Sequence, residues 1–183
     1  VCGNLYDYKD FDQMAEQELE SPENASCDPP IFLPFLFGER APGWSEGRQG
    51  GFLHLNGRHG TGAMYRAVLE GICFNIRQCY DVLCRVNHAP ERIHVSGGVV
   101  RSKVWSRILA NVLQKELLLS PVQNTSSIGG AKLALFAAGE IPDIHSHVVK
   151  ARETVSPDPA MSGIYDRLYR EYCDCYDKTR PEL

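Results

Sequence analysis

The pattern of apolar and polar positions predicts a chain in which helices alternate with short strands. The longest periodic segment runs from about Thr61 to Val86, where apolar residues recur every four positions. That spacing gives a helix one broad apolar stripe, and we expect the stripe to pack on a sheet. It is formed by Met64, Val68, Ile72 and Ile76, flanked by Leu69, Cys73, Tyr80 and Leu83.

Shorter helices and strands flank this segment. Helices are predicted over about 11–19, 104–113, 127–138 and 163–176, and strands over 31–36, 51–55, 92–95 and 116–119. Pro34 argues against a fully hydrogen-bonded central strand, and Gly139 is a natural cap for the helix that ends at Ala138. Because strands alternate with helices, the expected fold class is α/β, although so few strands seldom make a self-sufficient sheet.

The first thirty residues differ from the rest. Apart from one short helix candidate they show no periodic pattern, and Ser21–Asn24 and Asp28–Pro30 break the chain as a loop. We interpret residues 1–30 as the remnant of a preceding segment and a linker, and residues 31–183 as one domain.

Composition and charge narrow the classes of partner. The 183 residues are 43% hydrophobic and 23% charged, with a net charge of −4 and no run of Lys or Arg. These values are ordinary for a soluble globular domain and argue against a nucleic-acid partner. No apolar stretch reaches the roughly 18 residues that a membrane span needs, and no signal segment opens the chain. We therefore expect no membrane partner and a cytoplasmic location.

The cysteines and histidines do not form an obvious metal or nucleophile site. Three of the seven cysteines lie in the long helical pattern, where reduced buried thiols are usual. Cys173 and Cys175 form a C-x-C without a second pair, and His145-x-His147 lacks a third ligand. We predict reduced structural cysteines and no metal site, with metal or disulfide roles as the weaker alternative.

The strongest candidate for chemistry is the turn at Ser96–Gly98. A predicted strand ends in Gly97 and Gly98, and Ser102 then precedes a helix. Glycines let a ligand or another backbone come close because they lack a Cβ, and the amides of a helix N-terminus favour anions. A plain strand-to-helix turn uses the same residues, so both interpretations stay open. The segment is neither a dinucleotide fingerprint nor a P-loop.

Two other segments are weaker candidates. Ser127–Ala131 opens a helix with small side chains, which favours a close helix–sheet contact over a ligand site. Gly38–Trp44 holds Glu39 and Arg40 side by side in a loop bounded by glycine and proline. This pair could orient a substrate or tie the loop down as an ion pair, and the sequence does not decide between the two.

Together these segments resemble the C-terminal domain of the FGGY carbohydrate kinases. The matching stretches, in family order and at family spacing, are 32–44, 66–71, 96–105 and 127–131. The resemblance implies the second lobe of a ribonuclease-H-like, actin-type ATPase architecture, in which two lobes close on ATP and a sugar. It further implies that Gly97 and Gly98 form an adenosine-contacting turn with Ser102 near the nucleotide. The helix of Gly129 and Gly130 would pack beside that turn.

The sequence departs from the family in two ways. Val99 and Val100 replace the small residues common after the paired glycines, which would narrow the adenine side, and Gly130 stands where alanine is usual. The family's N-terminal lobe, with its phosphate-binding hairpin, sugar-binding residues and catalytic aspartate, has no counterpart here. The family's second phosphate-binding turn, which belongs to this domain, also has no counterpart here, so we expect the domain itself to be truncated at its N-terminal strands. Since phosphoryl transfer needs the whole cleft, we expect the chain alone to be inactive.

The resemblance also implies the partners. We expect ATP, Mg²⁺ bridging its phosphates, an N-terminal kinase lobe and a sugar or sugar acid, while a homodimer stays open. Gly38–Trp44 and Glu70–Asn75 look most like gluconate kinases, so gluconate is the expected substrate, with xylulose or another pentulose as the alternative. A non-catalytic module that binds nucleotide or a partner protein, and a gene fragment without a role, are the competing interpretations.

Overall fold

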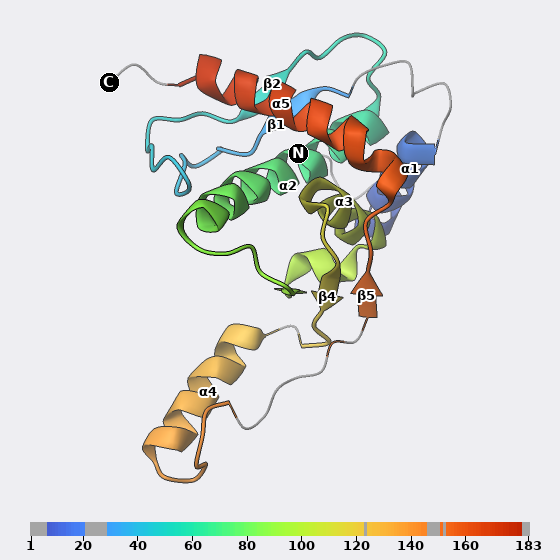
Figure 1. Ribbon diagram of the computed structural model, residues 1–183. Coiled ribbons are helices and arrows are strands. Elements are labelled where there is room, and N and C mark those ends of the chain that lie inside the picture. Colours follow the sequence, from blue (N-terminus) through green and yellow to red (C-terminus); the bar gives the residue numbers. More distant parts are fainter. Residues whose placement is uncertain (1–6, 21–28, 123, 146–150, 152, 181–183) are drawn as a thin grey trace.

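The computed structural model describes residues 7–20, 29–122, 124–145, 151 and 153–180 (Figure 1). Its helices are α1 (Tyr8–Glu20), α2 (Thr61–Val86), α3 (Lys103–Leu113), α4 (Thr125–Ala137) and α5 (Ser162–Lys178). Two short 3₁₀ helices are η2 (Gly98–Arg101) and η3 (Pro159–Met161). The strands are β1 (Ile31–Leu33), β2 (Gly51–Leu53), β3 (Ile93–Val95), β4 (Leu117–Leu119) and β5 (Glu153–Val155). The α/β class and the predicted order of elements are confirmed.

The strands form two small sheets. β1 and β2 pair antiparallel, and β1 stops directly before Pro34, as the proline predicts. β3 and β4 pair in parallel, with Ile93 opposite Leu117, and β5 then adds to β4 antiparallel. Parallel neighbours need a crossover connection, which here is η2 and α3. This crossover places the Ser96–Gly98 turn at the carboxyl end of β3.

Helix α2 lies at the centre of the molecule, in contact with α1, α3 and β1 (Figure 1). The predicted stripe of Met64, Val68, Ile72 and Ile76 is only half-buried, which corrects the predicted packing face. The buried face is rotated from it and consists of Gly62, Ala63, Ala67, Leu69, Glu70, Gly71, Cys73 and Phe74. Small residues on this face let the neighbours come close. A Cβ on Gly71 would lie 2.1 Å from the carbonyl oxygen of Phe32 in β1.

Helix α5 covers the other side of β1 and α3 (Figure 1). Its buried residues include Tyr165, Leu168 and Tyr172, whereas Ile164 is 42% exposed. The buried Glu70 accepts hydrogen bonds from Arg66 Nε at 2.8 Å and from the Tyr165 hydroxyl at 3.1 Å. We call α1, α2, α3 and α5, together with β1, the helical body.

Helix α1 belongs to this body although it lies in the segment that the sequence assigns to a preceding region. Ala15 is fully buried, and the rings of Phe11 and Tyr65 lie 5.3 Å apart. Glu16 pairs with Arg107 of α3 at 2.7 Å. These contacts attach α1 to both α2 and α3.

Helix α4 lies apart from the helical body (Figure 1). None of its residues is buried. Gly139 has a φ of +74°, and its N–H donates to Phe136 while that of Glu140 donates to Leu135. These two bonds form a Schellman motif, which confirms the predicted glycine cap. Among the described helices, none is both long and apolar enough to cross a membrane.

Candidate functional site

Serine hydroxyl groups at the start of α3 hold the turn that follows β3. Gly97 has φ +87° and ψ −147°, a conformation that side chains other than glycine rarely adopt. The Ser102 Oγ accepts a hydrogen bond from the Trp105 N–H at 3.1 Å and caps α3. The Ser106 hydroxyl lies 2.8 Å from the Val99 carbonyl oxygen and 2.9 Å from that of Ser102. The turn is therefore fixed on its α3 side before any ligand binds.

A cavity of about 520 Å³ opens beside this turn. Gly98 and Ser102, two of the three predicted nucleotide-binding residues, lie in its wall. The rest of the wall consists of Tyr8, Lys9, Asp12, Tyr65, Arg101 and Trp105. Its volume is within the usual range for small-molecule sites. Gly97 is not in the wall, and a Cβ there would meet nothing within 4 Å, so backbone conformation rather than crowding requires this glycine.

The wall combines flat rings with opposite charges. The hydroxyl of Tyr65 donates to Asp12 at 3.2 Å, and burial, then the neighbouring Asp12, raise the pKa of Tyr65 to about 12. Tyr65 thus stays neutral at physiological pH. Aromatic faces can stack on a planar ring, and the cations of Lys9 and Arg101 can attract an anion. A ligand with a planar ring and a negative group suits this combination.

Sequence reasoning missed the contribution of α1 to this cavity. Tyr8, Lys9 and Asp12 come from α1 and Tyr65 from α2, far along the chain from the paired glycines. No motif links these positions, and only the packing of α1 on α2 and α3 brings them to the turn.

The valines after the paired glycines lie away from the cavity beside the turn. Val99 and Val100 are partly buried and pack against the hydrophobic core. Neither lines the cavity beside the turn. Because η2 turns both side chains toward the core, their extra bulk is accommodated there.

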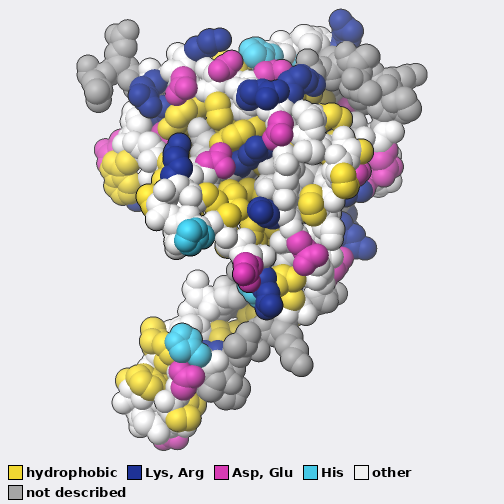
Figure 2. All heavy atoms as spheres, in the orientation of Figure 1, with side chains coloured by type: hydrophobic (Ala, Val, Ile, Leu, Met, Phe, Trp, Pro, Cys, Tyr) yellow, Lys and Arg dark blue, Asp and Glu magenta, His cyan; other side chains and the backbone are white. Residues whose placement is uncertain are grey.

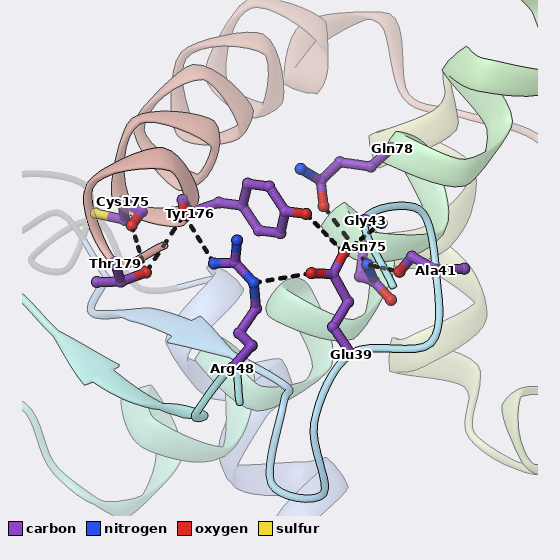
Figure 3. A network of polar contacts seen from close by, with 9 residues as sticks. All are labelled: Glu39, Ala41, Gly43, Arg48, Asn75, Gln78, Cys175, Tyr176 and Thr179. Atoms are coloured by element: carbon purple, nitrogen blue, oxygen red, sulfur yellow. Dashed lines mark hydrogen bonds and ion pairs between the residues drawn. The ribbon is translucent and has the colours of Figure 1, made fainter. Parts of the chain in front are cut away.

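The loop with Glu39 and Arg40 is held by a buried network (Figure 3). Glu39 pairs with Arg48 at 2.8 Å, not with the adjacent Arg40, and both side chains are almost fully buried. Glu39 also accepts hydrogen bonds from the Gly43 N–H at 2.7 Å and from the Tyr176 hydroxyl at 2.6 Å. The Glu39 carboxylate is thus fully engaged in tying the loop to α5.

Other contacts extend this network. Arg48 donates to the Tyr176 carbonyl oxygen at 2.8 Å and lies 3.8 Å from the Tyr176 ring centroid. Burial, followed by the hydrogen bond to Glu39, raises the pKa of Tyr176 to about 12. Arg40 is exposed instead, 5.8 Å from the ring of the exposed Trp44. Arg40 therefore remains available to a ligand, and its role in a cleft stays a prediction.

The small-residue helix does not pack beside the turn, and this prediction is wrong for the described chain. The contact that joins the start of α4 to the turn is between the hydroxyls of Ser96 and Thr125, at 3.2 Å. A Cβ on Gly129 or Gly130 would meet nothing within 4 Å. The close helix–sheet contact that small residues favour is therefore not made by the described residues.

The cysteines and acidic residues that the structure describes do not add a metal-binding cluster to the site. Over residues 7–20, 29–122, 124–145, 151 and 153–180, no three His, Cys, Asp or Glu side chains gather as a metal site. Cys2 and Cys27 lie outside these ranges, and the five described cysteines are free thiols. Burial raises the pKa of Cys173 and of Cys175, so neither is an activated thiolate. The reduced state expected for the cysteines stays a prediction.

Known proteins resemble both the sequence and the fold. The curated gluconokinase of Bacillus licheniformis is 28% identical over 177 residues, which cover 86% of this chain and 34% of that protein. The crystal structure of a xylulose kinase from Rhodospirillum rubrum matches with 35% identity and a TM-score of 0.72, over 93% of this chain and 33% of that one. A gluconate kinase from Lactobacillus acidophilus matches with 28% identity and a TM-score of 0.77, over 93% and 34%.

The chain thus spans about a third of the length of the relatives it matches. Residues 3–138 match the family profile described as "FGGY family of carbohydrate kinases, C-terminal domain". That match covers most of the chain, and the solved FGGY relatives share its fold, which is consistent with the ribonuclease-H-like, actin-type lobe that the resemblance implies. The chain belongs to the FGGY family of carbohydrate kinases.

Proposed function

We propose that this chain is the nucleotide-binding part of an ATP-dependent carbohydrate kinase. The adenosine end of ATP then occupies the cavity beside the Ser96–Gly98 turn. The observation that carries this proposal is the position of Gly98 and Ser102 in a cavity with aromatic and cationic walls. Tyr8, Tyr65 and Trp105 offer rings to the adenine, and Lys9 and Arg101 offer charge to the phosphates.

In this proposal the Ser102 hydroxyl both holds the start of α3 and faces the nucleotide. Its Oγ already accepts the Trp105 N–H and so fixes the first turn of α3 beside the cavity. The hydroxyl hydrogen is still available to donate to a ribose or phosphate oxygen, because a serine hydroxyl carries one donor as well as its acceptor sites. Gly97 contributes by allowing the turn itself.

Phosphoryl transfer needs groups beyond this lobe. In the proposed reaction a sugar hydroxyl attacks the γ-phosphate of ATP, and an aspartate from an N-terminal lobe accepts its proton. Mg²⁺ is expected with the nucleotide, but the described residues hold no cluster that fits this ion as its ligands. We therefore assign no metal ligand to this chain and expect the chain alone to transfer no phosphate.

Gluconate is the proposed acceptor, and xylulose is the alternative. The similar proteins include both gluconokinases and xylulose kinases at comparable identity. A non-catalytic module that only binds nucleotide remains the competing function. Phosphate transfer by the assembled kinase, assayed with gluconate and xylulose, separates the three.

The nucleotide site can be tested by calorimetric titration of the protein with ATP. Gly97→Ala forces a side chain onto the positive φ of the turn, and we expect ATP binding to weaken at least about tenfold, or ~1.4 kcal/mol. Gly139→Ala is the matched control, because Gly139 also has a positive φ and an open Cβ position but lies at the far end of α4. Equal ATP affinity in both variants, or no ATP binding by the wild type, would contradict the proposal.

A further inference from the structure

The cavity beside the Ser96–Gly98 turn contains opposite charges that do not neutralise each other. Its wall holds the carboxylate of Asp12 and the cations of Lys9 and Arg101. The ion pairs of the described residues include none of these three side chains. A ligand that matches such a wall has one anionic part and one uncharged part. A nucleotide has both, and the inference below rests on the proposed function for this reason.

The position of Asp12 is fixed by a contact between two helices. Asp12 comes from α1, and its Oδ1 accepts the hydroxyl of Tyr65 from α2 at 3.2 Å. Because the pKa of Tyr65 is raised to about 12, the hydroxyl keeps its proton at physiological pH and continues to donate it to Asp12. Among the described residues Oδ2 of Asp12 has no partner. An ionised carboxylate only accepts hydrogen bonds, so this pair offers the cavity acceptors and no donor.

The acceptors of this pair determine which part of a nucleotide they can face. Phosphate oxygens are themselves negative acceptors, so a carboxylate repels them. The nucleoside instead carries uncharged donors, which are the amino group of adenine and the hydroxyls of the ribose. We propose that Asp12 determines nucleoside specificity in this cavity, by accepting a hydrogen bond from an N–H or O–H donor of the nucleoside. Lys9 and Arg101 then remain for the phosphates.

The surrounding surface does not supply this discrimination. Acidic and basic side chains are interspersed on the face of the helical body seen in Figure 2, and the chain as a whole has a net charge of −4. Selection of an anion by a broad electrostatic field needs a surface with one sign of charge. Recognition of the nucleotide therefore depends on individual groups within the cavity, and Asp12 is the acidic one among them.

The variant Asp12→Asn tests the proposal in calorimetric titrations with ATP and with adenosine. It keeps the shape of the side chain and an oxygen for Tyr65, but it replaces the other acceptor by an NH₂ donor. We expect both ligands to bind at least about tenfold more weakly, and by the same factor, since both contain the nucleoside. Asp10→Asn is the matched control, because it removes the same charge from α1 outside the cavity wall and should leave both affinities unchanged.

Several results of these titrations would overturn the proposal. A loss confined to ATP, or tighter ATP binding by Asp12→Asn, would show that Asp12 faces the phosphates. A loss that disappears when Mg²⁺ is removed would show that Asp12 holds the metal ion, which is bound through carboxylates and phosphates in many nucleotide sites. ATP binding that Asp12→Asn leaves unchanged removes this inference alone, whereas a wild type that binds no ATP removes the proposed function as well.

Nucleotide analogues test the same contact from the side of the ligand and identify the donor. Purine riboside triphosphate lacks only the amino group of the base, while 2′-deoxy-ATP and 3′-deoxy-ATP each lack one ribose hydroxyl. The analogue without the recognised donor should bind the wild type about tenfold more weakly than ATP, and should bind Asp12→Asn as tightly as ATP does. Equal binding of ATP and all three analogues to the wild type overturns the proposal, and this comparison does not depend on the folding of any variant.

Discussion

Helices α2 and α4 are built from similar residues and have opposite surroundings. Each contains glycines and large apolar side chains, although α2 also carries several charged residues whereas α4 carries Lys132 alone. In α2 the glycines lie against the backbones of α1 and β1, and Phe74 is buried among tyrosine rings of α5. In α4 the same types of residue face open space. The comparison teaches that composition specifies how a helix can be buried, while the neighbouring chain determines whether it is.

The Ser96–Gly98 turn, the proposed nucleotide site, lies on the boundary between these two regions. On one side Ser102 and Ser106 fix it to α3, which packs into the helical body. On the other side one hydroxyl pair connects it to α4. The part of the proposed site that this chain builds is therefore the part that the helical body supports.

The largest expected change in the free energy of unfolding comes from truncating one phenylalanine in each of the two helices. Phe74 is 2% exposed and its ring lies 5.4 Å from that of Tyr172, whereas Phe136 is 49% exposed. Phe74→Ala should therefore lower the free energy of unfolding by about 4 kcal/mol. Phe136→Ala should change it by less than about 0.5 kcal/mol. Urea denaturation of the isolated chain, followed by fluorescence, measures both.

Similar losses for the two variants would break the comparison, because Phe136 would then have a partner within the chain. Leu133→Ala is a second control on α4, since Leu133 is 58% exposed and should behave like Phe136. Circular dichroism confirms that each variant remains folded before denaturation.

Replacing one glycine in each helix by alanine should change stability by a smaller amount, and in opposite directions. Gly71→Ala places a Cβ 2.1 Å from a backbone oxygen, so β1 or α2 must shift, and we expect a loss of about 2–3 kcal/mol. Gly130→Ala meets no atom within 4 Å. It should stabilise α4 by up to about 1 kcal/mol through helix propensity, seen as roughly five-fold slower amide exchange over 125–137. A stabilising Gly71→Ala, or faster exchange in Gly130→Ala, would contradict this difference.

Most elements could be predicted from the sequence because their signals are local. The four-residue apolar period marks α2, and the Gly139 cap marks the end of α4. β5 was not predicted, since Glu153–Val155 is a short, mostly exposed edge strand that exists only through its pairing with β4. The buried face of α2 was misplaced because small residues, which carry little apolar signal, allow the closest packing there.

The candidate site was only partly predictable for the same reason. Gly98 and Ser102 are close in sequence and carry a recognisable motif, so they could be found. Tyr8 and Tyr65 reach the cavity only through helix packing, which no local pattern encodes. Glu39 pairs with Arg48 nine residues away rather than with the adjacent Arg40, because the loop folds back on itself before it meets α5.

The smallest expected effect is a loss of stability at alkaline pH that arises in the helical body and not in α4. Burial and the hydrogen bond to Glu39 raise the pKa of Tyr176 to about 12, above the ordinary value of about 10 in the unfolded chain. Between these values the folded protein keeps a proton that the unfolded chain has lost. The stabilisation by Tyr176 is therefore complete below pH ~10 and is lost as the pH rises toward ~12. Helix α4 contains no tyrosine and has no such dependence.

The variant Tyr176→Phe isolates this contribution, because it removes the titrating hydroxyl and keeps the ring. At about pH 8 it should be roughly 1 kcal/mol less stable than the wild type, since Glu39 loses one hydrogen-bond donor. That difference should shrink as the pH rises through about 10 to 12, because only the wild type has a Tyr176 hydroxyl whose stabilising hydrogen bond is lost on ionisation. Urea denaturation at a series of pH values measures it, and Tyr65 titrates equally in both proteins and cancels. A difference that stays constant or grows with pH would show that the hydroxyl of Tyr176 does not hold its proton through burial against Glu39.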